Sequence, residues 1–193
     1  MTTANKITIF RILLIPVFVL LAVYYGESVS EKQPEPFLRY AAIAVFILAS
    51  VTDGLDGYIA RKYNQMSHLG TILDPIADKG LLNTAIITLS FCNWGIRFPS
   101  WFPVLVIARD LTIILGCLVV HYLHSKVTIR PSWIGKTTTV TQMLALVWVM
   151  LQIQWIDYRI LVWISGIFTF ISGAGYIYNG LHQLNEPSNV SHS

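Results

Sequence analysis

The sequence predicts an all-helical integral membrane protein with six transmembrane helices in one bundle. Two observations predict this fold class. Hydrophobic residues make up 54% of the 193 residues and charged residues only 12%, with a mean hydropathy of +0.60, whereas a soluble domain usually carries about 25% charged residues. Six apolar segments also reach the roughly 20 residues needed to cross the hydrocarbon core of a bilayer.

The six expected helices are Ile7–Tyr25, Phe37–Ala60, Thr71–Asn93, Phe102–Leu123, Ile134–Gln154 and Tyr158–Leu181. The connections between them contain helix breakers, with two prolines in GESVSEKQPEP, two in RFPSWFP and one in SKVTIRPS. We therefore expect residues 1–184 to form a single six-helix transmembrane domain, followed by a polar tail at residues 185–193.

The first apolar segment, within MTTANKITIFRILLIPVFVLLAVYY, resembles a signal peptide in its length. However, Arg11 and Pro16 lie inside the apolar run, and no A-x-A-like cleavage site follows it. We therefore expect a retained first helix.

The distribution of Lys and Arg predicts a multi-pass protein with both termini in the cytoplasm. If the N-terminus is inside, the inner connections carry Lys6, Arg61, Lys62, Lys126 and Arg130, and the outer ones carry Lys32, Arg97 and Arg159. The net charge is only +3, and the basic residues are scattered between apolar runs. This pattern favours anionic lipid as a partner and argues against a nucleic-acid-binding surface.

Four aspartates lie in the stretch DGLDGYIARKYNQMSHLGTILDPIADK, between two strongly apolar runs. Asp53 and Asp56 share one helix face with Gly57 and Ala60, because these residues are spaced i, i+3, i+4, i+7. Asp74 and Asp78 share a face by their i, i+4 spacing. The short polar turn between the two segments predicts antiparallel neighbouring helices, so that both pairs of carboxylates converge.

Four carboxylates in one dry site repel one another unless positive charge compensates them. Hard oxygen ligands favour Mg²⁺, Mn²⁺ or Ca²⁺, and the lack of a nearby Cys or pair of His argues against zinc. Two such ions would clamp a phosphoryl group, Gly57, Ala60 and Gly70 would leave room for a substrate, and Arg61 would bind phosphate. The alternative, that the carboxylates only cap helix ends, fits one aspartate such as Asp74 better than four in this spacing.

The aspartate stretch resembles the signature of the CDP-alcohol phosphotransferases, D-x-x-D-G-x-x-A-R-x8-G-x3-D-x3-D. All eight fixed positions match, and they are Asp53, Asp56, Gly57, Ala60, Arg61, Gly70, Asp74 and Asp78. The resemblance covers most of the chain. It implies a six-helix membrane fold, usually homodimeric, and an enzyme that transfers a phosphatidyl or related group from a CDP-linked donor to an alcohol, releasing CMP.

The same resemblance implies a role for each matching residue. Asp53, Asp56 and Asp74 would be metal ligands, and Asp78 would be both a ligand and the general base. The cofactors would be two Mg²⁺ or Mn²⁺ ions per active site. Gly57, Ala60 and Arg61 would line the nucleotide side.

Two further stretches resemble the branch of this family whose acceptor is glycerol 3-phosphate. One is NKITIFRILLIP, with Asn5, Thr8 and Arg11 three residues apart on one side of a helix, and the other is IGKTTTVTQM. The resemblance implies CDP-diacylglycerol and glycerol 3-phosphate as substrates, membrane lipid as surroundings, a homodimer, and an active site facing the cytoplasm of a bacterial inner membrane. Asn5 and Thr8 are then expected to bind the donor. The acceptor phosphate is expected to meet Arg11, Arg109, Arg130 and Lys136.

Three alternatives stay open, one of which is another CDP-alcohol phosphotransferase. The pair Arg109–Asp110 is typical of the branch that uses phosphatidylglycerol as acceptor and makes cardiolipin. Arg109 also lies about seven residues into an apolar segment, where an ionisable residue is by default a functional candidate; otherwise it is a snorkelling arginine or is paired with Asp110. A cation transporter is a third possibility, although the carboxylates cluster at one membrane end and no broken-helix halves are seen.

Overall fold

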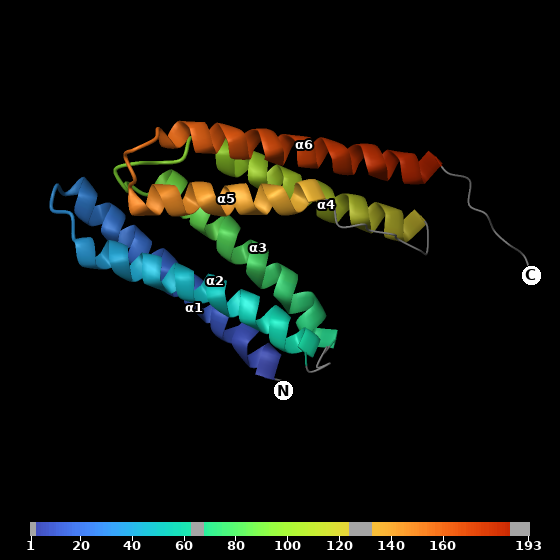
Figure 1. Cartoon of the computed structure of the whole chain (residues 1–193), viewed down its shortest axis with the longest axis horizontal. Coiled ribbons are helices and arrows are strands. Elements are labelled where there is room, and N and C mark those ends of the chain that lie inside the picture. Colours follow the sequence, from blue (N-terminus) through green and yellow to red (C-terminus); the bar gives the residue numbers. More distant parts are fainter. Residues whose placement is uncertain (1–2, 63–67, 124–132, 186–193) are drawn as a thin grey trace, which may run out of the picture. The chain divides into compact units, whose positions relative to one another are not determined.

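The structure is a computed structural model that describes the backbone of residues 3–62, 68–123 and 133–185, and the side chains of residues 8–52, 79–116 and 133–178. Over this part of the chain it contains six α-helices, as predicted (Figure 1). They are α1 (Thr3–Ser30), α2 (Pro36–Lys62), α3 (His68–Phe91), α4 (Trp101–Leu123), α5 (Trp133–Leu151) and α6 (Tyr158–Asn185).

The helices divide between two compact units. The first unit comprises Met1–Ser100 and Leu146–Ile153, and so contains α1, α2, α3 and the last part of α5. The second comprises Trp101–Ala145 and Gln154–Ser193, and contains α4, the first part of α5, and α6. A single bundle over residues 1–184 with a polar tail from 185 stays a prediction, although α6 itself includes Asn185.

Helix α1 continues to Ser30, five residues beyond its predicted end at Tyr25. In this extension the serine hydroxyls bond back to the helix: the Ser28 hydroxyl donates to the Tyr25 carbonyl at 2.7 Å. Lys32 then adopts a left-handed conformation, with φ at 60°, and the Gln33 amide donates to the Ser28 carbonyl at 3.0 Å. These bonds form a Schellman cap, which ends the helix without glycine.

Helix α5 ends at Leu151, three residues before its predicted end, because Gln152 has a φ of 52° and turns the chain. The Gln152 side chain then joins three segments of the first unit. Its Nε2 donates to the Tyr25 hydroxyl at 3.2 Å and to the Trp94 carbonyl, and its Oε1 accepts from Arg39. These bonds offset the strain of a left-handed residue that is not glycine.

The core of the first unit forms where α1 packs against α2 and α3. The rings of Phe18 and Phe46 meet with their centroids 5.8 Å apart. Ala22 and Ala42 are fully buried beside them, and such small residues allow helix backbones to approach closely. The indole Nε1 of the buried Trp94 donates to the Ala22 carbonyl at 3.1 Å, which fixes the start of the α3–α4 connection on α1.

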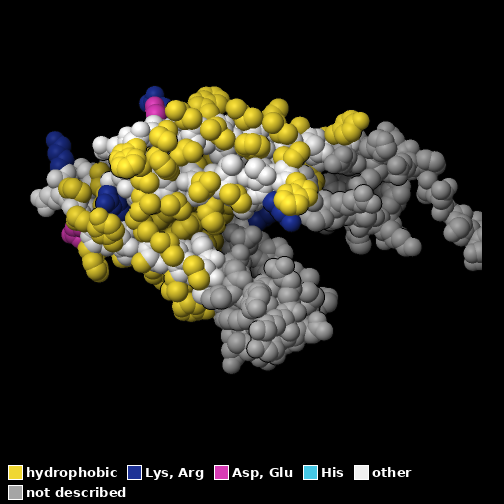
Figure 2. All heavy atoms as spheres, viewed as in Figure 1, with side chains coloured by type: hydrophobic (Ala, Val, Ile, Leu, Met, Phe, Trp, Pro, Cys, Tyr) yellow, Lys and Arg dark blue, Asp and Glu magenta, His cyan; other side chains and the backbone are white. Residues whose placement is uncertain are grey.

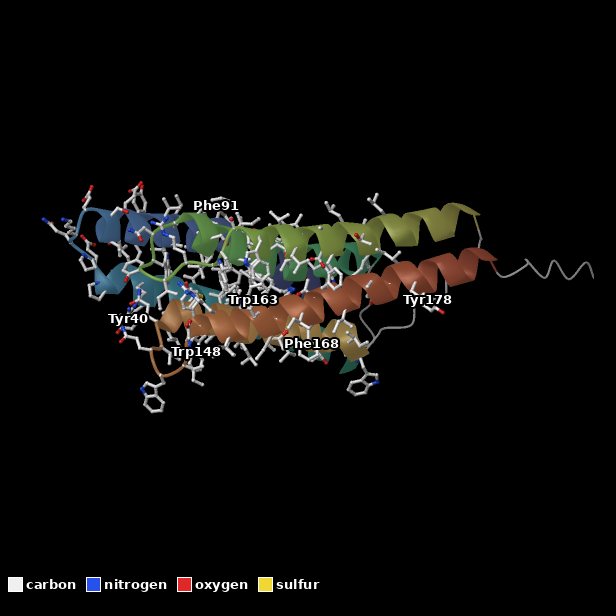
Figure 3. The ribbon with its side chains drawn as sticks, turned by 90° about the horizontal axis from the view of Figure 1, so that it is seen from above. Tyr40, Phe91, Trp148, Trp163, Phe168 and Tyr178 are labelled. Atoms are coloured by element: carbon white, nitrogen blue, oxygen red, sulfur yellow. The ribbon has the colours of Figure 1, made fainter. Side chains whose placement is uncertain are left out.

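In the second unit, buried polar side chains join α5 to α6. Gln142 on α5 donates from Nε2 to the Thr169 hydroxyl at 2.9 Å. One turn away, the Thr138 hydroxyl is 3.1 Å from the carbonyl oxygen of Phe168, which is labelled on α6 in Figure 3. Hydrogen bonds between polar side chains are a typical means of holding helices together in a bilayer, where the hydrophobic effect between them is weak.

Three helices within the described residues are long and apolar enough to cross a membrane. They are Thr8–Ser30, Trp133–Leu151 and Tyr158–Tyr178, and the apolar stretch Pro36–Thr52 is shorter. Hydrophobic side chains cover much of the described surface (Figure 2), including Leu13 and Phe170, which are 61% and 66% exposed. Such a surface suits surrounding lipid and agrees with the predicted membrane protein.

We expect Gly166→Ala to destabilise the second unit by about 1–3 kcal/mol, because overpacking forces neighbouring groups to move. A Cβ at Gly166 would lie 2.9 Å from two ring atoms of Trp101. That ring is held against Trp163, which is labelled in Figure 3, and the ring centroids are 4.8 Å apart. Thermal unfolding in detergent measures the effect. Gly175→Ala on the same helix is the control, since a Cβ there meets nothing within 4 Å; equal midpoints for both variants would contradict the prediction.

Candidate active site

The four aspartates of the motif lie on two helices of the first unit. Asp53 and Asp56 are in the C-terminal part of α2, and Asp74 and Asp78 are in the N-terminal part of α3. Their side chains lie outside the described ones, as do those of Gly57, Ala60, Arg61, Gly70 and Asn5, and Arg130 lies wholly outside the described residues. The structure thus gives the helical positions of the motif, while the roles of its side chains remain predictions.

The packing of α1 against α2 shows where Asp53 lies along the length of α1. The first residues of α1 and the last of α2 lie at the same end of the unit, so these helices are antiparallel (Figure 1). Phe18 of α1 contacts Phe46 of α2. Arg11 precedes Phe18 by seven residues and Asp53 follows Phe46 by seven, which is about 10 Å along each helix at a rise of 1.5 Å per residue. Arg11 and Asp53 therefore lie at the same level.

Helix α3 runs parallel to α1, and its contacts set the level of the other two aspartates. A Cβ at Gly80 would be 3.7 Å from Cδ1 of Ile15, and one at Gly26 would be 3.1 Å from the amide nitrogen of Asn93. Asp78 lies two residues before Gly80, and so is level with α1 just before Ile15. The backbones of both halves of the motif are thus level with one stretch of α1, residues 8–15.

That stretch of α1 contains two predicted site residues that are completely buried. Thr8 and Arg11 both have an exposed fraction of 0%. A buried guanidinium needs compensating negative charge, and Arg11 brings one positive charge to the stretch of α1 that is level with the backbones of the four aspartates. Divalent cations would supply the rest, and oxygen donors alone are the ligands that Mg²⁺ and Mn²⁺ prefer. The residue types of the motif therefore suit the predicted metal ions, and the binding of these ions stays a prediction.

The second unit contains the buried cation Arg109, on α4, with an exposed fraction of 8%. Its Nη1 donates to Oδ1 of Asp110 at 2.8 Å, which is the ion pair that the sequence offered as an alternative. Its Nε and Nη2 donate to the Ser172 hydroxyl at 3.3 and 2.9 Å. Among the described residues these contacts use three of the five N–H groups of a guanidinium, and leave one on Nη1 and one on Nη2.

The guanidinium of Arg109 lies beside the first turn of α5. A Cβ at Gly135 would be only 3.3 Å from Nη2 of Arg109. The next residue, Lys136, is exposed, and its Nζ lies 5.4 Å from the ring centroid of Trp133. Lys136 thus follows directly after the residue of α5 whose backbone faces Arg109. The planar guanidinium of Arg109 and the ammonium of Lys136, on its flexible side chain, are each suited to binding a phosphate ester.

Sequence reasoning missed the residues of α6 that surround Arg109. Ser172 accepts its hydrogen bonds, Gly173 lies against its aliphatic chain, and the Tyr176 ring centroid is 5.9 Å from its Cζ. The i, i+4 spacing of Ser172 and Tyr176 places both on one helix face. In the sequence, that spacing was the one sign that these residues act together. Their contact with Arg109 could not be read from the sequence, because Ser172 lies 63 residues from Arg109.

Comparisons with known proteins agree with the motif. The model of the family described as CDP-alcohol phosphatidyltransferase matches residues 1–171. A CDP-diacylglycerol–glycerol-3-phosphate 3-phosphatidyltransferase of Escherichia coli (strain K12) is 34% identical over 176 residues, which is 89% of this chain and 90% of the relative. A protein of the same description from Shigella flexneri serotype 5b (strain 8401) is 36% identical over 155 residues, 79% of each chain.

Proposed function

Because the chain belongs to the CDP-alcohol phosphatidyltransferase family, we propose that it transfers the phosphatidyl group of CDP-diacylglycerol to glycerol 3-phosphate. The products are phosphatidylglycerophosphate and CMP. The relatives at 34–36% identity carry this activity in their names. The chain is an enzyme of phospholipid biosynthesis, and the family assignment sets aside the cation transporter.

The observation that carries the choice of acceptor is the environment of Arg109. The guanidinium is buried, its position is fixed by Asp110 and Ser172, and its Nη2, which keeps one N–H group unused among the described residues, lies beside the first turn of α5. Glycerol 3-phosphate brings a dianionic phosphate, and a charge-assisted pair of hydrogen bonds to such a group is strong and directional. Lys136 adds a second positive charge, and Arg11 and Arg130 are the further candidates.

In the proposed reaction a hydroxyl oxygen of glycerol 3-phosphate attacks the phosphorus that carries the diacylglycerol. The bond from that phosphorus to the oxygen of CMP breaks, and CMP leaves with the electron pair. Asp78, as a carboxylate, accepts the proton of the hydroxyl. Gly57, Ala60 and Arg61, with Asn5 and Thr8, hold the CDP side of the donor.

Asp53, Asp56, Asp74 and Asp78 would hold two Mg²⁺ or Mn²⁺ ions. When bound, these ions supply positive charge to the diphosphate of the donor and to the departing CMP. Arg11 supports this arrangement, because a buried cation at the level of the motif lowers the repulsion between the four carboxylates.

The protein is further proposed to be a homodimer in a bacterial inner membrane, with the active site facing the cytoplasm. The excess of Lys and Arg in the connections on the side of the aspartate motif supports this orientation. The bacterial relatives from Escherichia coli and Shigella support the membrane assignment.

A second acceptor, phosphatidylglycerol, is favoured by one observation. The carboxylate of Asp110 already neutralises part of the charge of Arg109, which suits an acceptor with less negative charge than a phosphate dianion. The product would then be cardiolipin.

Labelled glycerol 3-phosphate distinguishes the two acceptors. Purified protein is mixed with CDP-diacylglycerol, Mg²⁺ and either labelled glycerol 3-phosphate or phosphatidylglycerol. We expect label to enter the lipid fraction in equal amount to the CMP released, and no CMP release with phosphatidylglycerol. CMP release with phosphatidylglycerol alone would assign the chain to the cardiolipin branch.

We expect Gly135→Ala to raise the KM for glycerol 3-phosphate. The new methyl group would lie 3.3 Å from Nη2 of Arg109 and would displace the guanidinium from the first turn of α5. Because one misplaced contact of this kind costs about 1–3 kcal/mol, the expected increase is about 5–100-fold. Gly175→Ala serves as the control, since its Cβ meets nothing within 4 Å. An unchanged KM in Gly135→Ala would show that this face of Arg109 does not meet the acceptor.

A further inference from the structure

We propose that Ser172 and Tyr176, on α6, are positioning residues that fix the Arg109 guanidinium for the phosphate of the acceptor. This inference rests on the proposed function and deepens it, because it assigns two residues that lie outside the aspartate motif. Neither side chain needs to touch the substrate. Each acts through the orientation of Arg109.

Ser172 fixes one edge of the guanidinium. Its hydroxyl is buried, with 3% of the residue exposed, and accepts from both Nε and Nη2 of Arg109. A single acceptor shared by these two donors defines the plane of the guanidinium as well as its distance. The remaining N–H groups on Nη1 and Nη2 are thereby held in fixed directions.

Tyr176 supports the face of the same guanidinium. The centroid of its ring is 5.9 Å from Cζ of Arg109, within the range of a cation–π contact. Its hydroxyl lies near Gly135, where a Cβ would be 3.5 Å from that oxygen and 3.3 Å from Nη2 of Arg109. Tyr176 therefore lies beside the same first turn of α5 that Arg109 faces.

The rest of α6 holds this arrangement in place. The aliphatic chain of Arg109 lies close to α6 at Gly173, where a Cβ would be in van der Waals contact with Cγ of Arg109 at 3.5 Å. One turn before Ser172, the hydroxyl of Thr169 accepts from Gln142 on α5 at 2.9 Å. Because α5 and α6 are joined next to the site, Ser172 and Gly135 approach Arg109 from two helices whose relative position is fixed.

The alternative is that Ser172 and Tyr176 only satisfy a buried arginine for stability. The two roles differ in what they predict. A structural residue changes the amount of folded protein, or changes all kinetic constants together, whereas a positioning residue changes the KM for the acceptor alone. Steady-state CMP release by the purified full chain, with CDP-diacylglycerol and glycerol 3-phosphate varied in turn, separates them.

We expect Ser172→Ala to raise the KM for glycerol 3-phosphate by about 10-fold, the effect of losing a hydrogen bond to a charged group. The KM for CDP-diacylglycerol and kcat should stay within about 2-fold of the original values, where a merely structural change would move them together. Ser172→Thr keeps the hydroxyl and should restore the KM. Ser165→Ala is the matched control: Ser165 is fully buried on the same helix, and its Oγ has no hydrogen-bond partner among the described residues.

Tyr176 gives a second, independent pair of variants. Tyr176→Leu removes the ring and should raise the KM for glycerol 3-phosphate several-fold, whereas Tyr176→Phe keeps the ring and should raise it less. The inference is overturned if Ser172→Ala and Tyr176→Leu have the same acceptor KM as Ser165→Ala. It is also overturned if they change only kcat or the KM for the donor.

CMP release by the unsubstituted protein with each acceptor shows whether the proposed function or only this inference is wrong. If that protein releases no CMP with glycerol 3-phosphate but does so with phosphatidylglycerol, the proposed function is wrong and this inference is wrong with it. If it uses glycerol 3-phosphate and the α6 variants bind that acceptor normally, only the positioning role is wrong.

Discussion

Asp78→Asn is expected to reduce CMP release by about 10²–10⁴-fold, the usual contribution of a general base. Asparagine has nearly the same size as aspartate but cannot accept the proton of the acceptor hydroxyl. It also removes one negative charge from the set of four carboxylates, so metal affinity should fall as well. This loss is expected to persist at saturating donor and acceptor, because a missing base lowers kcat rather than substrate binding.

The measurement is single-turnover CMP release, made together with Mn²⁺ binding to the same preparation. Asp157→Asn is the control, because Asp157 is exposed in the α5–α6 connection and accepts from the backbone amide of Arg159 at 2.9 Å, a bond that asparagine can keep. Near-normal turnover in Asp78→Asn, with Mn²⁺ bound, would show that another group takes the proton.

Arg109→Lys is expected to raise the KM for glycerol 3-phosphate by about 10–100-fold, since charged hydrogen bonds are worth about 1.5–3 kcal/mol each. Lysine keeps the positive charge beside Asp110, so the buried carboxylate still has a cation partner. It lacks the planar fork, however, and cannot bind Ser172 and a phosphate in the way that arginine does.

The control for this variant is Arg159→Lys, since Arg159 is exposed at the start of α6. Kinetics with varied glycerol 3-phosphate give the KM, and the KM for CDP-diacylglycerol should not change. An unaltered acceptor KM in Arg109→Lys would mean that Arg109 serves only the ion pair with Asp110.

The six helices could be predicted from the sequence because each apolar run is long and is bounded by breakers. The helix ends were less accurate. Hydrophobicity could not predict that α1 would continue to Ser30 through polar residues, whose serine hydroxyls bond to backbone carbonyls. The end of α5 likewise depends on Gln152, whose left-handed conformation is supported by partners more than 50 residues away.

For the site too, features within neighbouring segments of the sequence could be predicted, and contacts between distant segments could not. The placement of the four aspartates on two successive helices could be predicted, because their spacing lies within two neighbouring segments of the sequence. Arg11 and Arg109, predicted to meet the acceptor phosphate, are buried, and their roles stay predictions. Ser172 and Tyr176 could not be predicted, because their role depends on how α6 packs against α4. No local pattern of sequence records such a contact.

The most direct measurement is initial CMP release by the purified protein with CDP-diacylglycerol and Mg²⁺, using glycerol 3-phosphate, glycerol and phosphatidylglycerol as separate acceptors. We predict release with glycerol 3-phosphate and little with the other two, since the acceptor is recognised through its phosphate. Equal release with glycerol would contradict phosphate recognition at Arg109, and release with phosphatidylglycerol alone would contradict the proposed acceptor.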